Sequence, residues 1–196
     1  GTYTVVLEEP AVAELVMLLD YMGFGALAFQ EGRSFLSKKL GKKVMSEKIT
    51  IWDDGLNAGG VAFPFDYEGM PKRKVTLIEN GIARGVVYDS LTAGKEKKQS
   101  TGHSLPDPFT TGPMASNLFL RTGAHDIAEM IKSVKKGIYV TRFHYTNVIN
   151  SKGTVITGMT RDGTFLIENG KITKGIKNLR LTQSIAEALS KVSMVG

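Results

Sequence analysis

The sequence predicts an α+β fold: a mainly antiparallel, hairpin-built sheet with a few packed helices. The word Leu-Ile-Glu-Asn-Gly occurs twice, at 77–81 and at 166–170, and β-forming residues flank both copies. Asn-Gly is a strong hairpin signal, because both central residues of a type I′ turn need positive φ. Short alternating runs typical of strands also outnumber segments with helical periodicity. Two similar turns, or two equivalent hairpins in one pseudo-symmetric sheet, explain the repeat equally well.

Helical signals in the first half come from two segments. Pro10 suits the first turn of a helix over Ala11–Met22, which is apolar nearly all round and is therefore expected to be buried. Ser34 can cap a second helix over Phe35–Leu40, which Gly41 ends. The strands expected in this half span 2–7, 48–52, 75–78 and 82–88, with a turn at Asp53-Asp54-Gly55.

The second half shows the same mixture of elements. Helices are expected over Leu91–Lys97 and Ala124–Ser133, and a third over Ser184–Val192 with Thr182 as its cap. Between the first two, Thr101–Pro113 forms a long Gly/Pro-rich loop, and loops of this length are often functional. The remaining strands are expected at 138–144, 155–159 and 164–167 and near Ile172.

Composition is that of a globular protein, and we expect 1–196 to form a single domain. The chain contains no cysteine, which excludes disulfides, thiol nucleophiles and thiolate zinc sites and suits a cytoplasmic protein. No basic leader precedes the first strand, so no signal peptide is expected. Pro10–Phe29 is long enough to cross a bilayer, but it contains Glu14 and Asp20, each costing roughly 2.5–3.5 kcal/mol there. We therefore expect no membrane association.

The formal charge is +6, and much of the excess lies in two lysine-rich segments, 38–48 and 95–98. Such clusters suit either non-specific nucleic-acid binding or solvated surface helices. Since no aromatic residue is interleaved to stack on bases, the solvated interpretation is favoured.

Catalytic motifs are absent. The three histidines, His103, His125 and His144, are far apart, and none has the helical spacing of a metal-ligand pair. No Gly-x-Ser-x-Gly or phosphate-binding loop occurs either. We expect each histidine to be structural. In an unbroken strand, His144 would share a face with Arg142 and Thr146.

Several segments, in order, resemble the TldD/PmbA family, long named as modulators of DNA gyrase and understood as peptidases. The resemblance covers nearly the whole chain and is strongest over 158–170, Gly-Met-Thr-Arg-Asp-Gly-Thr-Phe-Leu-Ile-Glu-Asn-Gly. The other segments that carry it are Thr50–Asp54, Pro64–Gly69, Leu77–Gly81, Ser100–His103 and Gly137–Asn147.

The resemblance implies paired homologous subunits, of which the catalytic type carries a His-Glu-x-x-x-His helix and binds a metal that activates water. The matching segment here is Leu19-Asp20-Tyr21-Met22-Gly23-Phe24, so Leu19 and Phe24 stand at the two ligand positions. We therefore expect the PmbA-like, metal-free type, with no cofactor in this chain and the metal in a catalytic partner. Family members also have an N-terminal domain and a final strand beyond this region, so a fragment with an exposed sheet edge is expected.

On this basis we expect a non-catalytic subunit of a two-subunit metallopeptidase that helps to form a cavity for unfolded peptides, which could bind by strand addition. Its partner would be a homologous TldD-like metal-binding subunit or a second copy of itself. The alternatives are a protein associated with DNA gyrase or nucleic acid, and an enzyme that acts alone through a metal held by His103 and His144. The residues expected to contact peptide or partner are His103, Arg142, His144, Asn147, Arg161 and Asp162.

Overall fold

The computed structural model describes residues 1–196, and its strands form two separate sheets. All strand pairs are antiparallel except β1 with β6, which confirms the predicted α+β, mainly antiparallel fold. The larger sheet has the order β1-β6-β7-β8, with β9 also on β7; its strands are β1 (Thr4–Leu7), β6 (Lys136–Asn150), β7 (Val155–Glu168), β8 (Lys171–Gly175) and β9 (Arg180–Ser184). The smaller sheet has the order β4-β3-β2-β5; its strands are β2 (Ile51–Asp53), β3 (Val75–Glu79), β4 (Ile82–Ala83) and β5 (Leu118–Leu120).

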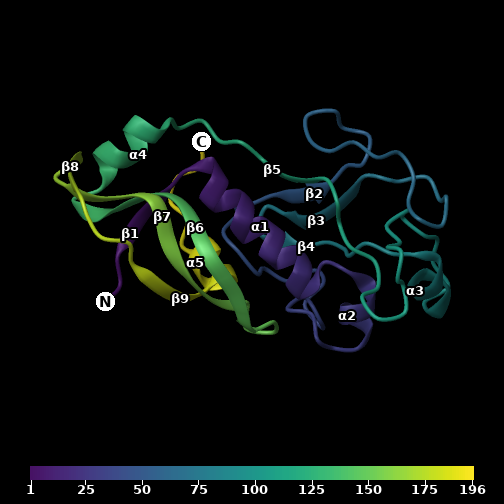
Figure 1. Cartoon of the computed structure of the whole chain (residues 1–196). Helices are drawn as coiled ribbons and strands as arrows, with labels where there is room; N and C mark the ends of the chain where they lie inside the picture. The colour runs from purple at the N-terminus through teal and green to yellow at the C-terminus, as the bar shows by residue number, and fades with distance from the viewer.

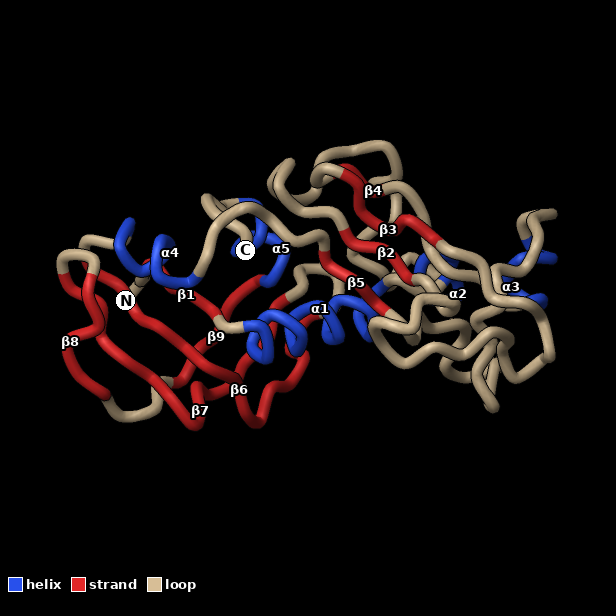
Figure 2. The backbone as a smooth tube through the Cα atoms, turned by 90° about the horizontal axis from the view of Figure 1, so that it is seen from above, coloured by secondary structure: helices blue, strands red, loops and turns tan.

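The first helix, α1 (Glu9–Gly23), runs from the larger sheet to the half of the molecule that holds the smaller one (Figure 1). Seen from above, that second half consists mostly of loops around its short strands (Figure 2). The other helices are short: α2 (Ala26–Gln30), α3 (Ser90–Lys95), α4 (Ile127–Ser133) and α5 (Ile185–Ser190). None of the helices has both the length and the apolar character required to cross a bilayer.

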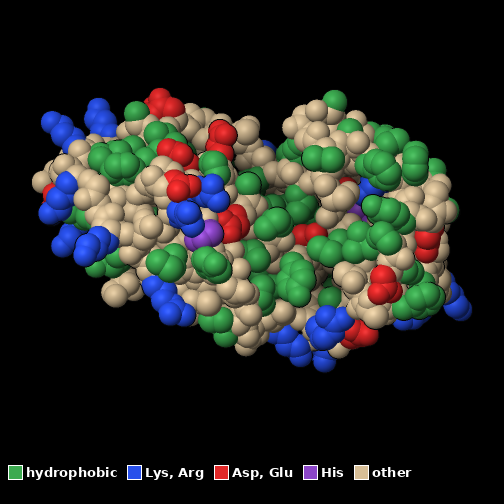
Figure 3. All heavy atoms as spheres, in the orientation of Figure 1, with side chains coloured by type: hydrophobic (Ala, Val, Ile, Leu, Met, Phe, Trp, Pro, Cys, Tyr) green, Lys and Arg blue, Asp and Glu red, His purple; other side chains and the backbone are tan.

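One hydrophobic core extends from α1 into both halves of the molecule. Leu15, Leu19 and Met22 of α1 are buried in it, as the apolar sequence of the helix predicts. The helix is nevertheless not buried all round, because Met17 is 59% exposed and Tyr21 68% exposed. Hydrophobic side chains also gather along the middle of the face that Figure 3 shows, between the two halves.

Both copies of the repeated word form tight turns between antiparallel strands, as predicted. Asn80 and Gly81 join β3 to β4, and Asn169 and Gly170 join β7 to β8, all with φ between 48° and 76°. Positive φ at both central residues is what a type I′ turn requires. The two hairpins lie in different sheets, so a single pseudo-symmetric sheet is wrong.

The predicted helix over Phe35–Leu40 is wrong; the helix in this region is α2, which comes earlier. Ser34 is buried, donates a hydrogen bond to the Gly23 carbonyl at 2.7 Å and accepts one from the Leu36 amide at 2.9 Å. Its hydroxyl thus ties a turn to the end of α1. Lys38 has φ 62°, which ends any right-handed helix at that point.

Other boundaries differ because tertiary pairing outweighs local pattern. Only Ile82–Ala83 of the predicted 82–88 strand pair in the sheet, whereas β6 continues to Asn150 and the two predicted runs at 155–159 and 164–167 are one strand, β7. The short strands β5 and β9 were not predicted. Asp126 caps α4 through a capping box, and Ser184 rather than Thr182 caps α5.

Strand β6 contains a bulge at Tyr145, which has φ 51° and lies where the register with β7 shifts. Beyond it, the Thr146 hydroxyl donates to the Glu14 carboxylate on α1. Thr146 is therefore turned towards the helix, and the expectation that it shares a face with Arg142 and His144 is wrong. An irregular residue reverses the alternation that the prediction assumed.

Candidate functional site

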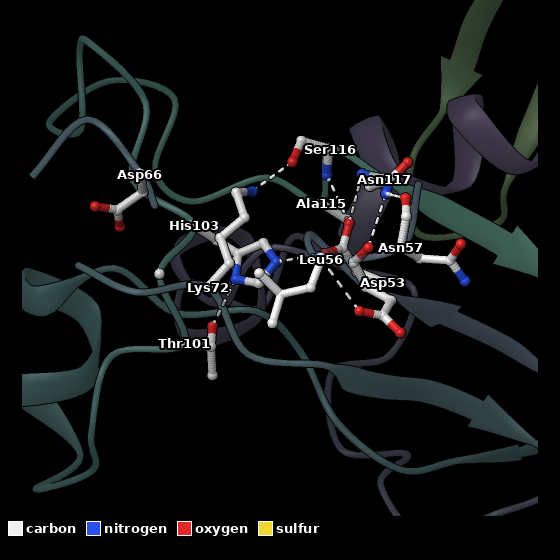
Figure 4. A network of polar contacts seen from close by, with 12 residues as sticks. Asp53, Leu56, Asn57, Asp66, Lys72, Thr101, His103, Ala115, Ser116 and Asn117 are labelled. Atoms are coloured by element: carbon white, nitrogen blue, oxygen red, sulfur yellow. Dashed lines mark hydrogen bonds and ion pairs between the residues drawn. The ribbon is translucent and has the colours of Figure 1, made fainter. Parts of the chain in front are cut away.

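A group of buried ionisable side chains lies between the end of α1 and the smaller sheet, and we call it the polar cluster. Such side chains are almost never fully buried unless they are paired. They come from α1, from the end of β2, from the loop between β2 and β3 and from the loop after α3, and most are drawn in Figure 4. The members of the polar cluster are Asp20, Asp53, Asp66, Lys72 and His103.

His103 and Asp53 form the centre of the polar cluster. His103 Nε2 lies 2.7 Å from Asp53 Oδ1, and since a carboxylate can only accept, this nitrogen carries the proton. Asp53 Oδ2 accepts from the backbone amides of Ser116 at 2.8 Å and Asn117 at 2.7 Å (Figure 4). Burial raises the pKa of Asp53, but the hydrogen bond and charge of His103 and the two amides outweigh it, so the pKa lies below its usual value.

The other nitrogen of His103 meets the hydroxyl of Thr101, with Nδ1 and Oγ1 2.9 Å apart. A hydroxyl, an imidazole and a carboxylate in this order have the composition of a hydrolytic triad. The Thr101 oxygen, however, accepts from the Tyr88 amide at 2.7 Å and is 3.0 Å from the Tyr88 carbonyl, and His103 is only 1% exposed. The hydroxyl and the imidazole are thus both occupied by contacts within the protein, and the arrangement holds the loop in place.

Asp20 enters the polar cluster from α1, and its Oδ1 accepts from the Ala115 amide at 3.1 Å. Burial raises the pKa of Asp20 to about 8; the Ala115 hydrogen bond lowers it, the charge of Asp53 raises it further, and Lys72 lowers it. Its carboxyl group therefore holds a proton more firmly than an ordinary aspartate does. Asp20 and Asp53 both fasten the segment around Ala115, one from the helix and one from the sheet.

Lys72 and Asp66 complete the polar cluster. The Lys72 ammonium donates to the Ser116 hydroxyl. Burial lowers the pKa of Lys72, while the charges of Asp53, Asp66 and Asp20 oppose this. The Asp66 carboxylate accepts hydrogen bonds from three backbone amides at 2.9 Å, one of which is that of Ser104. Together these bonds connect the loop between β2 and β3 to the loop after α3.

The two positions that the family resemblance assigns to metal ligands lie in the hydrophobic core. Leu19 and Phe24 are both fully buried in the main hydrophobic core, and neither side chain has a donor atom. Nowhere in the structure do three carboxylate or imidazole groups lie close enough together to hold a metal ion. The residues present at these positions therefore do not fit a catalytic metal.

Of the six predicted contact residues, five lie together on the β6–β7 hairpin, as the strand pairing requires. Arg142 Nη1 is 3.1 Å from Asp162 Oδ2, and Arg161 Nε is 3.5 Å from Asp162 Oδ1. The His144 ring meets the neighbouring Tyr145 ring edge-on with centroids 4.4 Å apart, and the Asn147 amide donates to the Tyr145 carbonyl at 3.0 Å.

The sixth, His103, belongs to the polar cluster and not to the hairpin, so the structure does not bring it together with His144. A shared metal site for these two histidines has no geometric support. The third histidine, His125, lies before α4, 3.5 Å from Glu129. Whether the five hairpin residues contact peptide or partner stays a prediction.

The prediction missed Asp20, Asp53, Asp66 and Lys72. Asp53 was placed in a turn, yet it is the last residue of β2 and continues the alternation of Ile49 and Ile51, both buried. That period of two was a usable signal for a buried carboxylate. Nothing in the sequence indicated that Lys72 would be buried, because its partners come from distant segments.

All 196 residues match the model of one protein family, described as the PmbA/TldA metallopeptidase C-terminal domain. A Buchnera aphidicola protein named metalloprotease TldD homolog is 36% identical over 202 residues, which cover 100% of this chain and 41% of that protein. A Haemophilus influenzae protein of the same name is 33% identical, over 83% of this chain and 34% of its own length. The chain thus spans about two fifths or less of these curated relatives.

Solved structures show the same fold. A Thermotoga maritima protein described as a proposed modulator of a DNA gyrase superposes with a TM-score of 0.88 at 26% identity, covering 100% of this chain and 45% of that one. TldE from Thermococcus kodakarensis superposes with a TM-score of 0.83 at 24% identity, covering 96% and 43%. The resemblance inferred from the sequence is confirmed.

Proposed function

Because the chain belongs to the PmbA/TldD metallopeptidase family, we propose that it acts as a non-catalytic subunit that helps a metal-binding homologue to hold and cleave unfolded peptides. One observation carries the proposal: Leu19 and Phe24 occupy the expected ligand positions and are fully buried in apolar core. Asp20, between them, accepts a backbone hydrogen bond from Ala115 and so has a structural partner. The chemistry of water activation would then belong to the metal of the partner subunit.

The larger sheet offers an edge to which a peptide strand could add. Strand β1 pairs with β6 only over Gly137–Val140, and from Arg142 to Asn150 β6 pairs with β7 on one side alone. An unpaired strand edge presents amides and carbonyls that bind any extended backbone, whatever its sequence. The predicted contact residues Arg142, His144 and Asn147 all lie on this part of β6.

A partner subunit would need an exposed apolar surface on this chain. The outer face of α1 offers one, since Met17 and Tyr21 are exposed there, and Tyr145 and Ile149 of β6 are exposed as well. Exposed apolar patches of this kind are typical of interaction sites. We propose a homologous metal-binding subunit as the partner, or a second copy of this chain, in a cytoplasmic assembly, which the lack of cysteine suits.

The test is co-purification of the full-length protein with a paralogue that retains His-Glu-x-x-x-His, followed by an assay on an unfolded substrate such as casein. We expect a stable complex that cleaves casein faster than the paralogue alone. The matched control replaces the motif glutamate of the paralogue with Gln, which should abolish cleavage and leave the complex intact. Absence of association, or an equal rate without this protein, would refute the proposal.

A nucleic-acid-associated role is the second candidate, favoured by the net charge of +6. It predicts binding to duplex DNA that weakens by several decades between dilute and physiological salt. A filter-binding titration across that salt range separates the two functions, since a peptidase subunit has no reason to show the steep dependence.

A further inference from the structure

Three lysines surround a pocket on the side of the molecule where the β6–β7 turn meets the segment between α2 and β2. The pocket has a volume of about 300 Å³, and we call it the lysine pocket. Lys39 and Lys43 come from the segment after α2, and Lys152 comes from the turn after β6, more than 100 residues further along the chain. Lys39 and Lys43 belong to the lysine-rich segment 38–48, which contributes much of the net positive charge. This segment is part of neither the polar cluster nor the β6 edge.

The backbone on both sides of the lysine pocket is held by hydrogen bonds. The Gly41 amide donates to the Ala83 carbonyl at 2.8 Å, and the Val44 amide donates to the Gly81 carbonyl at 2.8 Å. On the other side, the Gly153 amide donates to the Asn150 side chain at 3.0 Å. The lysines therefore project from fixed turns, which keeps three flexible side chains around one hollow.

The three charges have no acidic partner. Lys39, Lys43 and Lys152 take part in no ion pair, and no carboxylate lines the lysine pocket. Elsewhere in the chain, exposed lysines such as Lys98 and Lys191 do pair with glutamates. Three like charges around a small hollow repel one another, and a bound anion would relieve that repulsion.

The lining indicates which kind of anion fits. The Thr154 and Ser184 hydroxyls are already bonded to each other and to the Gly153 carbonyl, so ammonium groups are the donors that remain. Ammonium groups act as point charges and bind phosphate without the planar match that a carboxylate finds in arginine. Phe35 and Val44 add an apolar side that could pack against the organic part of a phosphate ester.

We propose that the lysine pocket binds a phosphate dianion, either as inorganic phosphate or as the phosphate group of a small monoester. The volume lies at the lower end of the range for small-molecule pockets, which favours a ligand of this size over a polymer. This site is separate from the proposed peptidase function, and either proposal can fail without the other.

The test is calorimetric titration of the full-length protein with inorganic phosphate and, in a second arm, phenyl phosphate, with chloride keeping the ionic strength constant. The triple variant Lys39→Gln/Lys43→Gln/Lys152→Gln should weaken binding on the order of tenfold or more, because charge-assisted hydrogen bonds are lost. Tighter binding of phenyl phosphate identifies a monoester as the ligand, and equal binding identifies inorganic phosphate. If the triple variant does not fold, the single substitution Lys152→Glu in the exposed turn should also weaken phosphate binding.

The matched control is Lys97→Gln/Lys171→Gln/Lys174→Gln, which removes the same charge from exposed lysines that form no ion pair and do not line the pocket. It should bind phosphate like the wild type. No binding beyond that of chloride, or equal losses in both triple variants, would overturn the proposal. So would salt-sensitive binding to duplex DNA that the pocket variant abolishes, since that would make the lysines part of a nucleic-acid surface.

Discussion

His103 Nε2 donates to Asp53 Oδ1 across 2.7 Å, and both side chains are completely enclosed by protein. The bond joins the end of β2 to the loop that follows α3. Because Asp53 also accepts hydrogen bonds from the amides of Ser116 and Asn117, one carboxylate holds the end of β2 to residues that lie 50 to 64 positions further along the chain.

Asp53→Ala should destabilise the fold strongly, because it leaves His103 and two backbone amides without their acceptor in a buried site. Removal of one member of a buried charged pair typically costs about 3–5 kcal/mol. Urea unfolding of the full-length protein, followed by circular dichroism, measures the change. Glu79→Ala, which removes an exposed ion pair with Arg84, is the control and should cost less than about 1 kcal/mol. Similar costs for the two variants would contradict the role assigned to Asp53.

The Asp20→Asn variant should become more stable relative to the wild type as the pH rises from about 4 to about 8. The pKa of Asp20 is raised from 3.8 to about 8 in the folded state, so the folded chain holds this proton more tightly than the unfolded chain does. Stability from Asp20 is thus complete below pH 3.8 and is lost as the pH rises through about 8. At about 1.4 kcal/mol per pKa unit, the loss amounts to several kcal/mol.

Asparagine keeps the acceptor for the Ala115 amide and carries no charge, so the variant should not show this loss. The measurement is the difference in the free energy of unfolding between variant and wild type at pH 5, 7 and 8.5. A difference that is the same at all three values would show that the Asp20 pKa is not raised. Asp53 has a lowered pKa, so its own contribution is lost only as the pH falls below about 4.

Phe24→Ala should cost about 3–5 kcal/mol, as is usual when a buried phenylalanine is truncated in a core. Phe24 is fully buried and its ring lies 5.6 Å from that of Phe35. Tyr21→Ala, three residues earlier on the exposed face of α1, is the matched control and should change stability by less than about 1 kcal/mol. Thermal unfolding of both variants tests whether the family ligand position has become a core position here.

Comparison of Gly81→Ala with Gly69→Ala distinguishes the cost of backbone strain, which both substitutions share, from the cost of a steric clash, which only Gly81→Ala has. Both glycines have φ near 76°, which costs an L-residue about 1–2 kcal/mol. A Cβ at Gly81 would lie 2.3 Å from the Met45 carbonyl oxygen, whereas nothing lies within 4 Å of one at Gly69. Gly81→Ala should therefore lower the unfolding midpoint clearly more than Gly69→Ala. Equal effects would mean that the β3–β4 turn is not packed against that carbonyl.

Short sequence patterns predicted the elements whose conformation depends mainly on their own residues. The Asn-Gly turns and helix α1 follow from the conformational demands of glycine and from an apolar helical pattern. Strands β5 and β9 could not be predicted in the same way, because each is short and is defined by the strand it pairs with. Ser34 likewise followed no local helix rule, since its hydroxyl bonds to the end of α1.

The site was harder to predict than the fold. Lys72 and His103 are separated from their partners by many residues, so burial and pairing appear only once the chain has folded. Tyr145 shows the same limit on β6, where one residue with positive φ reverses which side chains face α1. The positions of Leu19 and Phe24, by contrast, were found by family resemblance, and the structure adds that both are packed in the core.

We propose that the protein contributes to peptide cleavage without a metal of its own. Metal analysis by mass spectrometry, on the full-length protein alone and in complex with its His-Glu-x-x-x-His paralogue, tests it most directly. We predict less than one tightly bound metal per chain for the protein alone, no cleavage of casein by it, and a metal and cleavage in the complex. A stoichiometric metal in the protein alone, together with casein cleavage that chelation abolishes, would contradict the account.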